Sequence, residues 1–171
     1  MSKNADRESL PYSVSQNFLT SRRLIERLIK IAQLTKEDTV LEKGAAKRFC
    51  GLPRENLNAL LLKPFFEARI VYHFRRENFH PAPRVDTVLL ELKRKAVPDI
   101  QLFERRDFAA FLTHSFRYGL FGSHALLTKK QISTALRLSG LPPVERSGDI
   151  LYVQWLCLFR CWRQFGKKIG G

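Results

Sequence analysis

The chain has 171 residues, 44% of them hydrophobic and 27% charged, and these globular values exclude disorder as the default description. Thirty Lys and Arg against sixteen Asp and Glu give a formal net charge of +14, which favours a polyanion such as nucleic acid as partner over a surface that is basic only for solubility. Three cysteines without framework spacing, no signal-peptide pattern and no apolar run long enough for a bilayer predict a soluble, cytoplasmic protein.

The N-terminal half is predicted to mix helices and strands. Thr20 or Ser21 caps the first helix, Gly51 and Pro53 interrupt the second, and the last strand is expected to be buried on both faces. In chain order we expect a flexible arm over residues 1–14, a helix ending near Ala32, a short strand over 39–42, a broken helix over 45–63, a strand over 68–74, a turn or extended loop over 78–83 and a strand over 85–92.

From Pro98 onward the apolar period changes from two to 3.6, which predicts a small, all-helical C-terminal unit. Its helices are expected over 103–118, from Thr128 to Gly140, and over 149–165. Thr128 and Gln131 have the spacing of a capping box. The fold class is therefore α/β, with about three strands followed by this helical unit.

Two short segments carry a resemblance. Residues 15–20, SQNFLT, and 79–86, FHPAPRVD, together resemble the Erm family of 23S ribosomal RNA adenine-N6 methyltransferases, and the resemblance covers nearly the whole chain. It implies a truncated Rossmann-like methyltransferase domain over 15–97 and a helical RNA-binding domain over 98–171. It also implies S-adenosyl-L-methionine as cofactor, 23S rRNA as partner, and macrolide-type antibiotic resistance as the outcome. Neither a membrane nor a metal is expected as a partner.

The resemblance also implies site residues. In this family the first segment folds over the methionine end of the cofactor, which assigns cofactor contacts to Asn17 and Leu19; an ordinary helix lead-in is the alternative. The second segment is stiffened by Pro81 and Pro83, and the resemblance places Phe79 against the target adenine and Arg84 near the RNA. The alternative for Phe79 is a buried ring that anchors a turn.

The stretch DTVLEKGAAKRF, residues 38–49, resembles two parts of the family at once. Glu42-x-Gly44 matches the start of the glycine loop after the first strand, which assigns a cofactor contact to Gly44. The same residues resemble a later segment that follows the catalytic strand and begins a helix. We therefore hypothesise an internal deletion of roughly a hundred residues, or several strand-crossover-strand units. No catalytic residue is assigned, because the family's catalytic Asn-Ile-Pro-Tyr motif has no counterpart.

These observations lead to three alternatives for function. The family transfers methyl groups to an adenine of 23S rRNA, and this shortened chain is predicted to do so weakly or not at all, with cofactor binding weak or lost. The second alternative is a non-catalytic RNA-binding remnant that uses its basic stripes to contact phosphates. The third is an unstable deletion product without a role.

Overall fold

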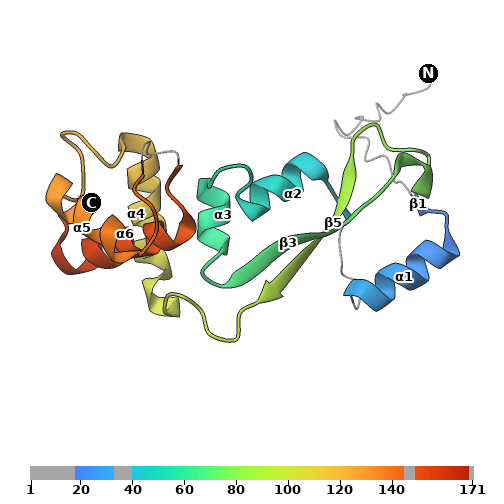
Figure 1. Cartoon of the computed structure of the whole chain (residues 1–171), viewed down its shortest axis with the longest axis horizontal. Coiled ribbons are helices and arrows are strands. Elements are labelled where there is room, and N and C mark those ends of the chain that lie inside the picture. The colour runs from blue at the N-terminus through green and yellow to red at the C-terminus, as the bar shows by residue number, and fades with distance from the viewer. Residues whose placement is uncertain (1–17, 33–39, 145–148, 170–171) are drawn as a thin grey trace, which may run out of the picture.

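The computed structural model describes residues 18–32, 40–144 and 149–169. Figure 1 shows an elongated arrangement, with a helical unit at one end, a sheet in the middle, and β1 and α1 at the other end. The sheet has three antiparallel strands in the order β2-β5-β3. They are β2 (Val40–Glu42), β5 (Thr87–Arg94) and β3 (Phe66–His73). The chain is thus α/β, as the sequence predicts.

The central strand β5 is buried on both faces only over Val88, Leu89 and Leu90. Val88 and Leu90 form a small core with Ala46 of helix α2 (Lys43–Cys50) on one side. Leu89 packs on the other side in a cluster with Leu28 of helix α1 (Arg22–Ala32). Leu92 is 48% exposed, so burial on both faces ends earlier than expected. At that end of the sheet the strands form the ion pair between Arg69 and Glu91.

The predicted broken helix is confirmed as α2 followed by α3 (Leu57–Leu62). Gly51 ends α2 with a φ of +72°, a left-handed conformation that glycine adopts without steric cost. Asn56 then caps α3, because its side-chain oxygen accepts a hydrogen bond of 3.0 Å from the backbone N–H of Ala59.

The helical unit comprises α4 (Arg105–Tyr118), α5 (Lys129–Leu138) and α6 (Tyr152–Phe165). The capping box of α5 is confirmed, since Gln131 N–H donates to Thr128 Oγ1 at 3.2 Å and Thr128 N–H donates to Gln131 Oε1 at 2.8 Å. The core is rich in aromatic rings and includes Phe108, Phe111, Leu112, Leu158 and Phe159.

Helix α3 also contributes to this core, because the fully buried Leu60 is one of its members. At the same junction, the Tyr152 hydroxyl donates a hydrogen bond of 2.6 Å to Asp99, which also pairs with Lys95. Burial and this hydrogen bond raise the pKa of Tyr152 above its ordinary range. The predicted domain boundary at residue 98 remains a prediction.

A second sheet consists of two short antiparallel strands, β1 (Phe18–Leu19) and β4 (Phe79–His80). Residues 78–83 were expected to form a turn or extended loop, yet 79 and 80 pair as a strand because a partner strand comes from the N-terminal segment. One-turn 3-10 helices at Arg76–Asn78 and Leu102–Glu104 precede β4 and α4. Within the described ranges, no helix is long and apolar enough to cross a membrane.

Candidate functional site

The two-stranded sheet joins the two segments on which the resemblance rests. Phe18 is paired with His80 and Leu19 with Phe79, and the Thr20 N–H donates a hydrogen bond of 3.0 Å to the Asn78 carbonyl. Leu19 and Phe79 lie on the inner face of this ribbon, whereas Phe18 and His80 are exposed on the outer face. Segments about sixty residues apart in sequence therefore form one local structure.

Phe79 is held inside a small hydrophobic cluster. Its side chain is 7% exposed, and its ring centroid lies 5.1 Å from that of Phe74. Leu28 of α1 and Leu89 of β5 complete the buried part of the cluster. The alternative of a buried ring that anchors a turn describes this position, and a contact with a target base stays a prediction.

The predicted cofactor residues that the structure describes lie in two different parts of the chain. Leu19 is half-buried against the Phe79 cluster, and Asn17 lies outside the described residues. Gly44 lies in the first turn of α2, in a different part of the sheet unit. Leu19, Gly44 and Phe79 do not line five of the best-formed cavities among the described residues, which have volumes of about 220 to 560 Å³.

The Gly44 segment forms a strand that runs directly into a helix. β2 ends at Glu42 and α2 begins at Lys43, whose backbone N–H donates a hydrogen bond of 2.8 Å to the Asp86 carbonyl. A Cβ added to Gly44 would lie 3.0 Å from Glu42 Oε1, so the space above this glycine faces the chain's own side chain. The sequence resembled both the start of a glycine loop and a segment that begins a helix, and the structure forms the helix.

These residues do not fit S-adenosylmethionine. Nucleotide cofactors in Rossmann-like sheets bind at a glycine loop beyond the carboxyl ends of parallel strands. Here the loop is replaced by helix α2, and every strand pair among the described residues is antiparallel. The described part of the chain therefore contains no glycine loop of the kind that binds S-adenosylmethionine.

Exposed basic residues lie in the turns on either side of β4. Arg84 is exposed, and its carbonyl accepts a hydrogen bond of 3.1 Å from Arg76 Nη2, which ties together the turns on either side of β4. Phe18, 63% exposed, places an aromatic ring on the same face as His80. Exposed rings and cations are the groups that nucleic acid uses, because bases stack on rings and phosphates bind cations. Sequence reasoning missed Phe18, whose orientation depends on the pairing with β4.

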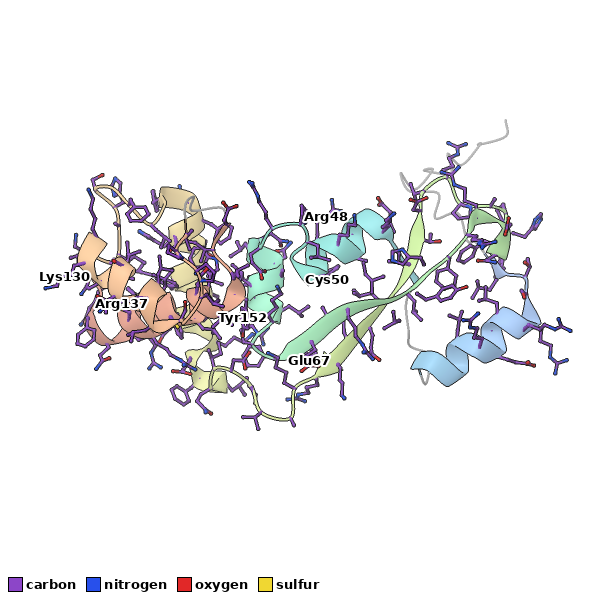
Figure 2. All side chains as sticks on the ribbon, viewed as in Figure 1. Arg48, Cys50, Glu67, Lys130, Arg137 and Tyr152 are labelled. Atoms are coloured by element: carbon purple, nitrogen blue, oxygen red, sulfur yellow. The ribbon has the colours of Figure 1, made fainter. Side chains whose placement is uncertain are left out.

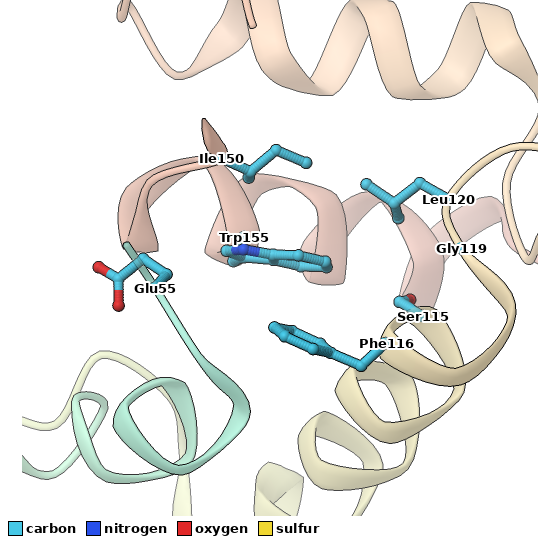
Figure 3. A pocket seen from close by; sticks show the side chains of 7 residues that line it. All are labelled: Glu55, Ser115, Phe116, Gly119, Leu120, Ile150 and Trp155. Carbon is cyan, nitrogen blue, oxygen red and sulfur yellow. The ribbon is translucent and has the colours of Figure 1, made fainter. Parts of the chain in front are cut away.

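The described cavities are concentrated in the helical unit and at its junction with α3. Figure 3 shows one of about 220 Å³, where the rings of Phe116 and Trp155 stack with centroids 5.4 Å apart. Glu55 lies at its edge, and the carboxylate points away from the two rings (Figure 3). No group of three His, Cys, Asp or Glu side chains within the described ranges could hold a metal.

No protein-family model matches the chain. It is 28% identical over 157 residues to an rRNA adenine N-6-methyltransferase of Lysinibacillus sphaericus, covering 92% of this chain and 58% of that protein. An rRNA adenine N-6-methyltransferase of Limosilactobacillus reuteri is 26% identical over 159 residues, covering 93% and 59%. The chain thus spans less than two thirds of these relatives. The crystal structure of the 23S rRNA methyltransferase ErmE has a similar fold, with a TM-score of 0.60 and 24% identity over 73% of this chain and 53% of that chain.

Proposed function

We propose that the chain, which is similar to rRNA adenine N-6-methyltransferases, is a shortened member of the Erm family that binds 23S ribosomal RNA and methylates it weakly or not at all. The observation that carries this proposal is the direct run from β2 into α2, where the family resemblance requires a cofactor loop. Without that loop, a chain lacks the contacts that hold the methyl donor in position for attack by the adenine amine.

An internal deletion accounts for the missing glycine loop that would bind the cofactor. Alignments with the two relatives include over nine tenths of this chain but less than three fifths of either relative. The segments on which the resemblance rests still pair through β1 and β4, as expected if the lost part lay between them in sequence. Sequencing the gene across the codons for residues 38–50 tests this, and a frame that reads through additional codons there would contradict it.

RNA binding is supported by the charge and by its distribution. The net charge of +14 lies on a chain whose helical unit and β4 turns both present exposed Arg and Lys. Arg84 and Phe79 are proposed to lie near the RNA, Arg84 through phosphate contacts and Phe79 by fixing the loop that carries it. Such binding releases counterions, so the affinity must fall steeply with salt.

Two measurements on the purified chain test the proposal. Calorimetric titration with S-adenosylmethionine is expected to give no binding heat, and a 23S rRNA transcript is expected to take up little or no labelled methyl. Fluorescence anisotropy with the same RNA is expected to show binding whose log-log slope against salt is negative. A full-length relative serves as positive control, and methyl transfer by this chain at the control's rate would refute the proposal.

The second candidate function is full adenine-N6 methylation with macrolide-type resistance, which the paired motif segments favour. Expression in a macrolide-sensitive host, with the adenine's methylation read by primer extension, distinguishes it. Near-UV circular dichroism during urea unfolding addresses the third alternative, since a chain without a cooperative transition would have no function to assign.

A further inference from the structure

A groove of about 490 Å³ runs between α5 and α6 in the helical unit. Ala135, Leu138 and Phe165 supply its apolar walls, and Lys130 and Arg160 supply cations. Leu138 is 75% exposed and Phe165 is 62% exposed, so large apolar surfaces remain open at the groove. Its volume is in the range of sites that hold small organic groups. Figures 1 and 2 show α5 next to α6, and Figure 2 shows Lys130 and Arg137 at the outer end of the unit.

The charged side chains that line this groove, Lys130 and Arg160, are both basic. Residues 108–144 and 150–169, which include all of α5 and α6, contain no Asp or Glu. Among the described residues, Lys130 and Arg160 form no salt bridge, and the hydrogen bond of Arg160 goes to the Asp99 carbonyl at 3.5 Å. Arg163, by contrast, is neutralised by Glu104 and Asp107. Two unneutralised cations at an apolar groove favour a ligand with an anionic group and a flat apolar body.

We propose that this groove binds one nucleotide of a single-stranded RNA segment. The base lies against Phe165, and phosphates of the segment contact Lys130 and Arg160. A base stacks on an aromatic ring whatever its identity, so this contact contributes affinity without sequence preference. The inference deepens the proposed function, because it names an RNA contact distant from the β1–β4 ribbon. An apolar helix of a protein partner would fill the groove equally well but would leave both cations without a counter-charge.

The chain carries its own probes for the test. Cys157 and Cys161 line the groove, whereas Cys50 lines a separate cavity at the α2–α3 junction. All three thiols are free and partly exposed. Burial raises the pKa of Cys161 and of Cys50, so each thiol's rate is compared only with its own rate without RNA.

The purified chain is alkylated with N-ethylmaleimide at pH 8.5, with and without a saturating unstructured RNA decamer, and each cysteine is followed by peptide mass spectrometry. We expect alkylation of Cys157 and Cys161 to slow at least fivefold while Cys50 is unchanged. Equal protection of Cys50, or unprotected groove thiols while anisotropy shows bound RNA, would overturn the assignment but leave the proposed function standing. Absence of any RNA binding would overturn both.

Substitutions give an independent readout. Lys130→Glu combined with Arg160→Glu is expected to weaken decamer binding more than tenfold and to flatten the salt slope by about one to two. Phe165→Ala is expected to cost about tenfold in affinity with the slope unchanged. Arg48→Glu on α2, which Figure 2 shows on the sheet unit, is the charge-reversal control. Losses no larger than the control's, with far-UV circular dichroism confirming folded variants, would refute the proposal. Protection of the thiols by an amphipathic peptide but not by RNA would refute it too.

Discussion

Replacing Phe79 by Ala distinguishes a ring that anchors the fold from a ring that contacts a base. The side chain is 7% exposed and packs against Phe74, and its strand pairs with the segment that leads into α1. Removing a buried Phe side chain typically costs about 3 to 5 kcal/mol, and the small size of this cluster argues for about 3 kcal/mol. That cost raises the open fraction of the ribbon roughly a hundredfold.

Hydrogen exchange followed by mass spectrometry measures this opening directly. In F79A, amides of residues 18–32 and 74–80 should exchange about a hundred times faster, and those of α4 to α6 should be unchanged. Phe18→Ala, on the outer face of the same ribbon and 63% exposed, is the matched control and should change exchange by less than threefold. The reasoning fails if F79A leaves exchange unchanged but abolishes RNA binding, since that result would assign the ring to the RNA.

Three further predictions concern local structure. Gly51→Ala should lower the free energy of urea unfolding by about 2 kcal/mol, because φ is +72° and the new Cβ would lie 2.3 Å from Glu55 Oε2. Gly140→Ala, at φ +69° with open space around it, should cost about half as much, and equal losses would refute the steric argument. Thr128→Ala should cost about 1 kcal/mol in the same assay by removing the cap of α5, and an unchanged midpoint would contradict that role. The raised pKa of Tyr152 means that the folded state keeps its proton at alkaline pH while the unfolded state releases it. Stability should therefore fall above about pH 10. In Tyr152→Phe the melting temperature should depend less on pH between pH 8 and 11.

Local sequence patterns predicted the helices well. The Thr128 box, the glycine after α2 and the change of period near Pro98 each act over a few residues, so one stretch of sequence contains the whole signal. A helix was predicted from residue 45, but the two residues before it were also matched to a glycine loop, and the helix in fact begins at Lys43. An Ala-Ala-Lys-Arg run has high helix propensity, and that propensity prevails over the resemblance of Glu42-x-Gly44 to a loop.

Local patterns did not predict the ribbon, and they gave the burial of Phe79 only as an alternative. Strands of two residues have no measurable alternation, and their register depends on a partner about sixty residues away. Phe79 is buried by side chains from α1, β3's end and β5, so its environment exists only in the folded chain. The exposure of Leu92 has a similar cause, because an alternating strand does not reveal which face lacks a covering element.

Leu60 has a practical consequence for dissecting the molecule. An expression fragment that starts at residue 98 would lack this side chain and its neighbours Leu57, Leu61 and Phe65, and their contact surface on the helical bundle would meet water. A fragment that begins at residue 55 would instead keep α3 packed on that surface. We therefore expect a fragment that begins at residue 55 to fold more stably than one that begins at residue 98.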